Sequence, residues 1–328
     1  MKKGIVLGLD GGGTYTRVVA ADLKGKILAF SKHPGSHPRK NQHPGDNVKA
    51  AIHEVLQQAN ASVSLVQCIV GGFAGLNSPE DQQWAREYLN ITGLECLKIV
   101  VNDAQVAQFG AFLGGQGVLA IAGTGSIVLG KTEAGSIVRN YDFHHDSEAA
   151  ARYLSYSVIY EIITQKPPLE EQAFIQSVLA YWGTSSVEEL RLLASKGFSE
   201  DRVQAVQHLS RMAAVVSSAA ANGSETAFRA CQKVIGSLVT GIELVASMFS
   251  SAQVPLALVG GVINDPFMKK LLREKLDNKI SDQTFSYHKP QLSPVLGAVL
   301  YSYKEVGIQL NQEILEKLLM AERTNNFY

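Results

Sequence analysis

The chain has 328 residues, 46% of them hydrophobic and 18% charged, and its 30 Lys and Arg residues balance its 30 Asp and Glu residues to a formal net charge of +0. That balance excludes a polybasic coat for wrapping nucleic acid and an acidic tail, and the length favours two domains at about 100–200 residues each. No stretch stays apolar over the roughly 18 residues that a transmembrane helix needs, so we expect neither nucleic acid nor a membrane as a partner.

Cysteine usage and the first residues indicate the cellular compartment. Cys68, Cys96 and Cys231 lie at long spacings that match neither a disulfide framework nor a CxxC metal cluster, so we expect reduced thiols. The apolar residues 5–9 end at Asp10 and are too few for an export signal. We therefore expect a cytoplasmic protein and interpret these residues as a buried strand.

A pattern of strand, glycine turn and strand occurs twice. The turn Gly11–Thr14 separates two β-rich runs between residues 5 and 22, and the turn Gly123–Ser126 separates two such runs between residues 118 and 130. Each pattern predicts a hairpin. Two hairpins of one design, one opening each half, predict a duplicated domain with a cleft between the halves.

Apolar spacing and start and stop residues predict alternating helices and strands between the hairpins. The predicted elements are a helix over residues 48–56, a strand over 66–72, a helix starting at Ser78–Pro79, a strand over 98–101 and a helix over 104–113 capped by Asn102–Asp103. The segment 32–46, rich in His, Pro and Gly, is predicted to be a mobile loop. This alternation predicts the α/β class, a sheet covered by helices.

The second half is predicted to be more helical. A helical stretch from Ser199 to Met248 breaks at Asn222–Ser224, a strand over 256–259 runs into two glycines, and later helices start at Pro266 and Pro294. We predict a first lobe over residues 1–116 and a larger second lobe, with a helical insertion, over 117–310. An amphipathic helix at about residues 311–323 is predicted to pack back on the first lobe.

The glycines after the first strand predict a phosphate site. Gly11–Thr14 would direct several backbone N–H groups to one point, and Asp10 at the strand end would hold Mg²⁺ directly or through water. A Rossmann fingerprint fails because Thr16 takes the place of the third glycine, and a P-loop fails because no Gly-Lys-Ser/Thr follows. The alternative is a tight β-turn with an incidental acid.

Gly123–Ser126 is the matching turn in the second half. Its glycines allow a phosphate to approach the backbone, and Thr124 and Ser126 add hydroxyl donors. Such residues are common in hairpins, so the turn alone is a weak signal. Together with the first turn, it predicts that two hairpins hold a triphosphate from both sides.

Asp103 is the candidate catalytic residue. It follows a strand and begins a helix, the place where ligands gather in α/β folds. A kinase needs a carboxylate that orients a substrate hydroxyl and accepts its proton. The alternative is simple helix capping, and only the two phosphate turns favour the catalytic interpretation.

Two further motifs carry weaker signals. Gly260–Gly261 after a strand would let adenine or ribose approach the backbone, or it is ordinary glycine punctuation. His144 and His145 stand beside Asp146 and Glu148, but no third ligand follows at a recognisable spacing. This segment therefore favours a polar loop that contacts substrate over a zinc site.

Five motifs occur in the order found in the actin-like ATPase superfold. They are Asp10–Thr14, Asn102–Ala104, Ala122–Ser126, Val259–Gly261 and Pro294–Ala298. More narrowly, nearly the whole chain resembles the N-acetylglucosamine kinase group of the BadF/BadG/BcrA/BcrD ATPase family. The resemblance implies two ribonuclease-H-like lobes that close around Mg-ATP and an amino sugar, with ATP and Mg²⁺ as cofactors. We also expect a homodimer.

The resemblance implies roles for named residues. Asp103 would be the base, and Asp10 would act at the magnesium and the phosphates. The candidate ATP- and phosphate-binding residues are Asp10, Gly11, Gly12, Gly13, Thr14, Arg17, Gly123, Thr124, Gly125, Ser126, Gly260 and Gly261. The candidate sugar-binding residues are Ala74, Gly75, Leu76, Asn102, Asp146 and His37.

The chain departs from the family pattern in two places. The usual Gly-Asp-Glu-Gly-Ser segment reads His145-Asp146-Ser147-Glu148-Ala149, in which Asp146 would keep its role. The early loop, which usually offers an Asn to the sugar, reads Gly35-Ser36-His37-Pro38-Arg39. His37 or Arg39 would suit an acidic substituent such as the lactyl group of N-acetylmuramic acid, although solvated loop residues explain these side chains equally well.

The sequence thus predicts an ATP-dependent kinase of the 6-hydroxyl of N-acetylglucosamine, N-acetylmuramic acid or both. The alternatives are a glucosamine kinase, an ATPase that activates a 2-hydroxyacyl-CoA dehydratase, and a sugar-responsive binding protein without catalysis. The cysteine spacing disfavours the activator, which needs closely spaced cysteines for an iron–sulfur cluster. Asp10 and Asp103 disfavour a protein without catalysis, and the missing cysteine-rich zinc motif disfavours the related ROK sugar kinases.

Overall fold

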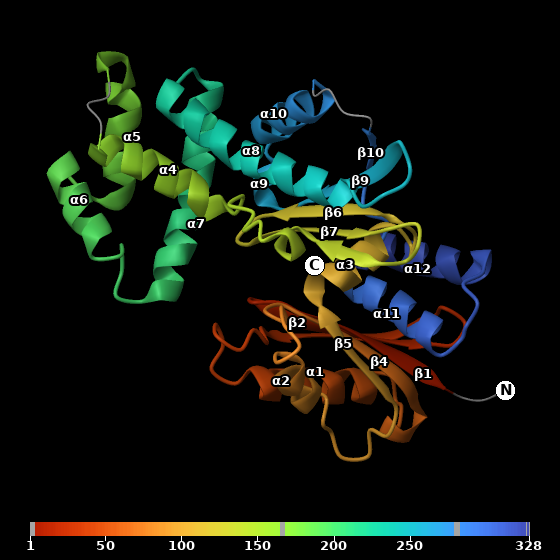
Figure 1. The fold of residues 1–328 in the computed structure, drawn as a ribbon. Helices are drawn as coiled ribbons and strands as arrows, with labels where there is room; N and C mark the ends of the chain where they lie inside the picture. Colours follow the sequence, from red (N-terminus) through yellow and green to blue (C-terminus); the bar gives the residue numbers. More distant parts are fainter. Residues whose placement is uncertain (1–3, 165–167, 279–282, 326, 328) are drawn as a thin grey trace. The chain divides into compact units, whose positions relative to one another are not determined.

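The computed structural model describes residues 4–164, 168–278, 283–325 and 327. The chain forms two compact units, which Figure 1 shows in the colours of the sequence. The first unit comprises Met1–Gly117 with Lys289–Tyr328, and the second comprises Val118–His288. The predicted boundaries placed residues 289–310 in the second lobe, whereas in the structure they belong to the first unit.

The first unit is built on a five-stranded sheet with the order β3-β2-β1-β4-β5. Its strands are β1 (Ile5–Gly11), β2 (Tyr15–Asp22), β3 (Ile27–Pro34), β4 (Val66–Phe73) and β5 (Leu97–Asn102). The first three strands form an antiparallel meander. The other two lie parallel to β1, so the carboxyl ends of β1, β4 and β5 share one edge of the sheet.

Helices cover both faces of this sheet because side chains alternate along its central strand. Ile5, Leu7 and Leu9 of β1 join one buried cluster with α1 (Pro44–Gln58) and α2 (Gln82–Tyr88). Val6 joins a second cluster on the opposite face. The helices of that second cluster are α3 (Asp103–Ala111), α11 (Pro294–Glu305) and α12 (Gln312–Thr324).

Close packing and two long-range hydrogen bonds explain why α11 belongs to the first unit. The Ser302 hydroxyl donates to the carbonyl of Leu7 at 3.0 Å, and the Tyr303 hydroxyl donates to the carbonyl of Asp22 at 2.6 Å. A Cβ on Gly297 would lie 2.1 Å from the carbonyl oxygen of Val106, so only glycine lets α11 approach α3 this closely. Local sequence patterns do not reveal such long-range contacts, and the predicted boundary therefore fell too late in the chain.

The second unit repeats the strand order of the first. Its sheet has the order β10-β9-β6-β7-β8, which read in reverse is β8-β7-β6-β9-β10. Numbered by their order in the unit, these are the third, second, first, fourth and fifth strands, as in the first unit. The strands are β6 (Gly117–Ala122), β7 (Ser126–Lys131), β8 (Ile137–Arg139), β9 (Gln253–Val259) and β10 (Thr284–His288). Strand β9 is parallel to both β6 and β10. The predicted α/β class with two related halves is confirmed.

Most helices of the second unit lie between β8 and β9. They are α4 (Ala151–Thr164), α5 (Gln172–Trp182), α6 (Val187–Ser195), α7 (Arg202–Ala221) and α8 (Glu225–Ala246). Strand β9 is followed by α9 (Gly261–Asn264) and α10 (Pro266–Asp277). The predicted break at residues 222–224 is confirmed, since the Ser224 side chain accepts the N–H of Ala227 and caps α8. The single-turn 3₁₀ helices are η1 (Val63–Leu65), η2 (Asn140–Phe143) and η3 (Leu169–Glu171).

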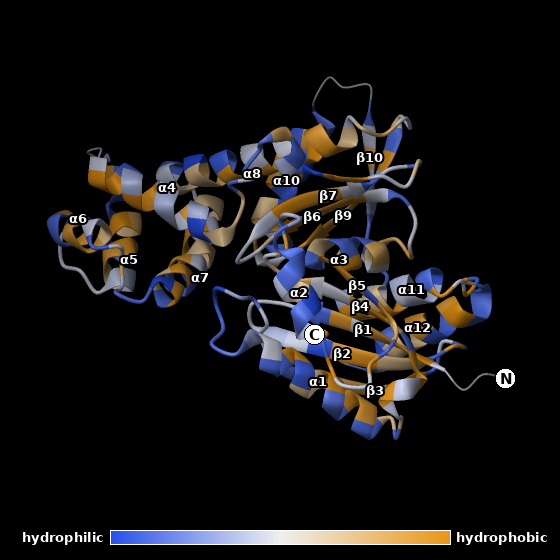
Figure 2. Cartoon of the chain, turned by 60° about the horizontal axis from the view of Figure 1, so that its bottom comes forward, coloured by the Kyte–Doolittle hydropathy of each residue, from blue (hydrophilic) through white to orange (hydrophobic). Residues whose placement is uncertain are grey.

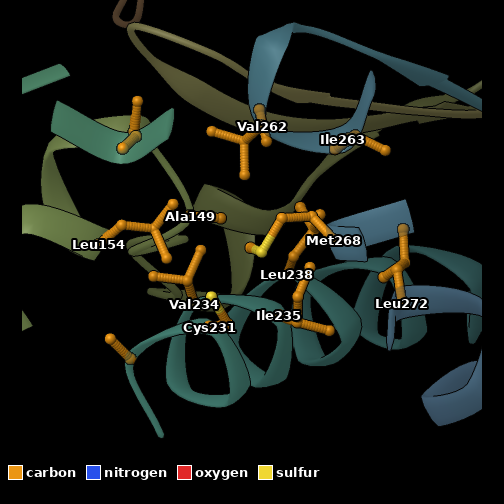
Figure 3. Close-up of a cluster of buried hydrophobic side chains, with 14 of the residues drawn as sticks. Ala149, Leu154, Cys231, Val234, Ile235, Leu238, Val262, Ile263, Met268 and Leu272 are labelled. Carbon is orange, nitrogen blue, oxygen red and sulfur yellow. The ribbon is translucent and has the colours of Figure 1, made fainter. Parts of the chain in front are cut away.

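The cores follow the hydropathy of these elements. In Figure 2 the strands are mainly orange, whereas blue residues lie on the outer faces of the helices. Figure 3 shows one part of the second core, where side chains from α4, α8, α9 and α10 meet. Among the described residues, no helix is long and apolar enough to cross a membrane. All three cysteines are free thiols.

One predicted helix start is wrong. Ser78 and Pro79 precede α2, which begins at Gln82. The Asp81 carboxylate accepts the N–H groups of Asn77 and Ser78 at 2.9 and 3.0 Å. These bonds close a separate turn before the helix, and the residues typical of a helix start serve that turn.

Candidate functional site

Asp10 lies at the end of β1, where its sequence neighbours become the glycine turn. Its register partners are Arg17 on β2 and Gly72 on β4. The Arg17 Nη1 donates to Asp10 Oδ2 at 3.1 Å, in a pair whose side chains are 18% and 12% exposed. Burial raises the pKa of Asp10, and Arg17 opposes that rise. Arg17 therefore holds the Asp10 carboxylate rather than presenting a free cation.

Asp103 lies close to Asp10 because β4, the strand between them, has a glycine without a side chain at this position, Gly72. A Cβ on Gly72 would lie 2.3 Å from Cγ2 of Val106 and 3.3 Å from the Cα of Asp103. Glycine at position 72 thus lets α3 start directly against the strand that pairs with Asp10. The helix cap is Asn102, whose side chain accepts the N–H of Ala104. The capping alternative for Asp103 therefore loses its main support, although Asp103 Oδ1 also accepts that N–H at 3.0 Å.

Burial and a like charge act together on Asp103. Burial, followed by repulsion from Asp10, raises the pKa of Asp103 to about 7, against hydrogen bonds from backbone N–H groups and the charge of Lys40. A carboxylate with a pKa near the working pH is well matched to accept a proton and release it again. The first unit thus contains two neighbouring carboxylates, and the pKa of one of them, Asp103, lies at about 7.

The glycine turn is held by its carbonyl groups. The carbonyl of Gly11 accepts the N–H of Ala74 at 2.9 Å, and that of Gly12 accepts the N–H of Ser36 at 3.0 Å. In the part of the chain that the structure describes, the backbone N–H groups of Gly13 and Thr14 have no hydrogen-bond partner. Donors arranged in this way at a loop tip suit an anion.

The segment Ala74–Asn77 is fixed beside this turn. The Asn102 Nδ2 donates to the carbonyl of Leu76 at 2.9 Å and to Asn77 Oδ1 at 3.3 Å. Since its Oδ1 caps α3, the Asn102 amide is occupied within the protein, and Asn102 is only 5% exposed. These hydrogen bonds join Asn102 to the Ala74–Asn77 loop, and the sugar contact predicted for Asn102 stays a prediction.

His37 lies against the same loop. A Cβ on Gly75 would lie 3.0 Å from the His37 Nε2, while Nδ1 accepts the N–H of Arg39 at 3.1 Å. Burial, followed by the charges of Lys40 and Arg39, lowers the pKa of His37. The lowered pKa favours a neutral His37 imidazole at pH 7, and because Nδ1 accepts a hydrogen bond, the ring proton lies on Nε2.

In the second unit, two glycine turns lie side by side. Parallel pairing places Ile121 of β6 opposite Val259 of β9, so the turns that follow these residues are neighbours. A Cβ on Gly123 would lie 3.6 Å from the backbone nitrogen of Gly261. Gly260 has a φ of +113°, and a Cβ there would lie 2.2 Å from the carbonyl oxygen of Ala122, so only glycine fits.

The turn Gly123–Ser126 is anchored from several directions. The carbonyl of Gly123 accepts the N–H of Ala151 at 2.7 Å, and that of Thr124 accepts Nη1 of Arg152 at 3.1 Å. The Ser126 hydroxyl donates to the carbonyl of Ser147. At the tip, a Cβ on Gly125 would meet no atom within 4 Å. The turn is thus rigid at its base and open at Gly125.

Both glycine turns of the second unit open into a cavity of about 470 Å³. Pockets for nucleotide-sized ligands typically measure about 300–1,000 Å³. Its walls come from α4, α7 and the segment from α9 to α10, and they include the apolar side chains of Leu154, Val262 and Met268 that Figure 3 shows. Polar groups of Gln207, Ser210, Arg211, Ser217 and Asp265 complete the lining.

Asp146 itself does not line this cavity, and it is exposed. The Asn140 side chain holds the preceding residues, because Nδ2 donates to the carbonyl of His145 and Oδ1 accepts the N–H of Val128. Among the described residues, no group of three or more His, Cys, Asp and Glu could hold a metal ion.

Comparison with known proteins decides the family. Residues 7–302 match the model of the BadF/BadG/BcrA/BcrD ATPase family. The chain belongs to this family. The predicted resemblance is therefore confirmed, and the match covers both units.

Two curated relatives of this family member are sugar kinases by name. The N-acetylmuramic acid/N-acetylglucosamine kinase of Clostridium acetobutylicum is 26% identical over 271 residues, which cover 79% of this chain and 86% of the relative. The N-acetyl-D-glucosamine kinase of Dictyostelium discoideum is 33% identical over 150 residues, which cover 41% of this chain and 46% of that protein.

Solved structures support the fold. A Chromobacterium violaceum protein assigned as an N-acetylglucosamine kinase has a TM-score of 0.64 at 20% identity, with 92% of this chain and 99% of that chain covered. A ROK family glucokinase from Streptomyces griseus, in complex with glucose and AMPPNP, has a TM-score of 0.53 at 17% identity, with 91% and 98% covered. The likeness shows that the two-lobed fold is shared.

Helix α7 contributes to the cavity in a way that the sequence motifs did not predict. Gln207, Ser210, Arg211, Ala214 and Ser217 line it from one helix face. Their spacing of three and four residues places small and polar side chains on one stripe of a largely apolar helix. That stripe was the available signal, but no motif attaches it to a nucleotide, and only the fold brings it opposite Gly261.

Proposed function

We propose that this protein is an ATP-dependent kinase that transfers the γ-phosphoryl group to the 6-hydroxyl of N-acetylglucosamine, N-acetylmuramic acid or both. Family membership and the names of the two curated relatives support an amino-sugar kinase. The observation that carries the proposal is Asp103, a carboxylate with a pKa of about 7 beside Asp10 and the turn Gly11–Thr14. We include a cytoplasmic location and a homodimer in the proposal, the latter testable by mass in solution.

Asp103 is proposed to be the general base. It orients the sugar hydroxyl and accepts its proton as the oxygen attacks the γ-phosphorus. Burial, followed by repulsion from Asp10, raises its pKa and so favours proton uptake, because protonation removes a buried charge next to another carboxylate. The backbone donors of Gly13 and Thr14 are proposed to bind phosphate oxygens.

Asp10 is the residue proposed to act at Mg²⁺. Magnesium is usually held by one or two carboxylates together with substrate phosphates and water rather than by a cage of protein ligands. The buried Asp10 carboxylate at the end of β1 fits that mode of binding. The ion would neutralise phosphate charge, and Arg17 would orient the Asp10 carboxylate toward it.

The cavity of the second unit is proposed to bind the adenosine of ATP. Its mixture of apolar and polar walls suits a flat heteroaromatic base with a ribose. Gly260 and Gly261 would allow the nucleotide to approach the backbone, and Gly123–Ser126 would bind its phosphates.

The sugar is proposed to contact the Ala74–Leu76 segment and His37 in the first unit. Asn102 would hold that segment in place, and the neutral His37 would donate a hydrogen bond from Nε2. The exposed Asp146 of the second unit keeps its predicted role as a sugar ligand.

The dehydratase-activating ATPase is the less favoured alternative. Cys68 and Cys231 are buried, and burial raises the pKa of each thiol to about 12. Iron–sulfur ligands are thiolates, so these two cysteines are poor ligands. A glucosamine kinase remains an alternative that the sugar assay separates.

A sugar screen tests the proposal. ADP release is measured by a coupled assay with N-acetylglucosamine, N-acetylmuramic acid, glucosamine, N-acetylmannosamine and glucose, and ³¹P–¹H correlation NMR of the product locates the phosphate. We expect release that depends on an N-acetylated amino sugar, with phosphorus coupled to the two protons on C6. ATP hydrolysis at the same rate with and without every sugar would refute the kinase.

A further inference from the structure

The side chain of Lys40 lies over the turn Gly11–Thr14. A Cβ placed on Gly13 would lie 3.3 Å from Cδ and 3.6 Å from Nζ of Lys40. Lys40 is exposed, and within the described residues its ammonium group has no hydrogen-bond or ion-pair partner. A cation is therefore present beside backbone donors that themselves lack partners.

The backbone of the loop holds Lys40 in this place. The N–H groups of Lys40 and Asn41 both donate to the carbonyl of His37, at 3.1 and 3.2 Å. The loop is fastened at its start, where the Ser36 N–H donates to Gly12 and the Asn47 Nδ2 donates to the carbonyl of Gly35 at 2.8 Å. The segment predicted to be a mobile loop is thus tied to the glycine turn.

Lys40 also lies close enough to Asp103 to act on it. Its charge is among the influences that lower the pKa of Asp103 against burial and Asp10. The ammonium group therefore lies within electrostatic reach of the proposed base and in contact distance of the turn that would bind phosphate. An anion that lies next to both the proposed base and the turn would interact most strongly with this ammonium group.

We propose that Lys40 binds the γ-phosphoryl group of ATP while it is transferred. The inference rests on the proposed function. In that step the sugar oxygen forms a bond to the γ-phosphorus, the bond from phosphorus to the bridging oxygen breaks, and ADP leaves with the electron pair. The hydroxyl proton goes to Asp103, and Lys40 stabilises the equatorial oxygens of the moving group.

A carboxylate on the sugar is the other anion that Lys40 could meet. The phosphoryl group is favoured because Lys40 extends over Gly13, whereas His37, the loop residue that faces the Ala74–Leu76 segment at Gly75, is neutral. The two anions predict different kinetics for a variant without the Lys40 charge, since N-acetylglucosamine carries no carboxylate and N-acetylmuramic acid carries one.

The test compares Lys40→Met, Lys40→Arg and the control Lys26→Met on both sugars. Lys26 is an exposed residue of the same unit, and its substitution by Met removes the same charge at a position away from the loop. We expect Lys40→Met to lower kcat about 10²–10³-fold on both sugars by the same factor, as loss of a transition-state donor does. KM for each sugar should stay within about twofold, Lys40→Arg should recover most of the rate, and Lys26→Met should match the wild type.

A second measurement separates this inference from the proposed function. Binding of ADP is measured with and without aluminium fluoride, which mimics the transferring phosphoryl group. Lys40→Met should weaken binding of the mimic at least about tenfold and leave ADP alone within about twofold. If the wild type lacks sugar-dependent activity but Lys40→Met still weakens the mimic, the kinase proposal fails and the Lys40 inference stands.

Three results would overturn the inference. They are an unchanged affinity of Lys40→Met for the mimic, an unchanged kcat in an active enzyme, and a loss confined to N-acetylmuramic acid. The last would assign Lys40 to the sugar carboxylate.

Discussion

Asp10 and Asp103 are neighbouring carboxyl groups that differ in their hydrogen-bond donors and charged neighbours. Arg17 donates to Asp10 and favours its ionised form, whereas Asp103 has only backbone N–H donors and the charge of Lys40 against burial and repulsion. Two titratable groups with environments of different polarity take different roles. Burial thus raises the pKa of both carboxyl groups, and Arg17 opposes that rise at Asp10.

The pKa of Asp103 predicts an acidic limb in the rate profile. A general base must be ionised, and its folded-state pKa is about 7, so kcat/KM should rise with pH and level off above that value. Below it, the rate should fall by about tenfold per pH unit. ATP affinity measured over the same range serves as the control, and a rate that is constant from about pH 5 to pH 8 would contradict the role.

The sequence indicated which residues of the first unit are candidates for the site, but not their protonation states or hydrogen-bond partners. Motifs indicated Asp10, Asp103 and the glycine turns, since each follows a strand. The neutral state of His37 and the occupied amide of Asn102 depend on neighbours brought together by folding, the Arg39 N–H in one case and the Leu76 carbonyl in the other. Single-sequence patterns do not contain those partners.

At the scale of elements, each unit uses parallel strand pairing to bring two segments together. In the first unit β1 and β4 place Asp10 beside Gly72, and in the second β6 and β9 place Gly123 beside Gly260–Gly261. Hairpins and strand ends were predictable because glycine turns interrupt β-rich runs. The start of α2 and the anchoring of the loop at 35–41 were not, because Asp81 and the carbonyl of Gly12 make bonds that override the local signals.

Gly260 and Gly261 should respond differently to alanine. At Gly260 the φ of +113° and the contact with Ala122 predict a loss of stability of roughly 1–3 kcal/mol. At Gly261 a Cβ meets no atom within 4 Å, so the fold should tolerate alanine while the added methyl group obstructs the cavity.

Thermal unfolding and ATP titration check this pair. We expect Gly260→Ala to lower Tm and Gly261→Ala to keep the wild-type Tm while weakening ATP binding several-fold. Equal Tm values for the two variants, or wild-type ATP affinity in Gly261→Ala, would contradict the assignment of these glycines.

At the scale of the whole molecule, the two units share one strand order but differ in what surrounds it. The second carries the helices α4–α8 between its third and fourth strands, where the first has only α1 and η1. The duplication was predictable from the two hairpins. The return of Lys289–Tyr328 to the first unit was not, because it depends on Ser302 and Tyr303 reaching the carbonyls of Leu7 and Asp22.

One carboxylate of this molecule, Asp103, is proposed to accept the proton of a sugar hydroxyl during phosphoryl transfer. Asp103→Asn keeps an oxygen for the Ala104 N–H, so the variant should fold, and Asp46→Asn is a matched control with an exposed side chain in the same unit.

The most direct test is the rate of sugar phosphate formation by Asp103→Asn, measured together with its dissociation constant for ATP. We predict a fall in kcat of at least about 100-fold with ATP affinity nearly unchanged and full activity in Asp46→Asn. An Asp103→Asn variant that retains most of its turnover would contradict the account.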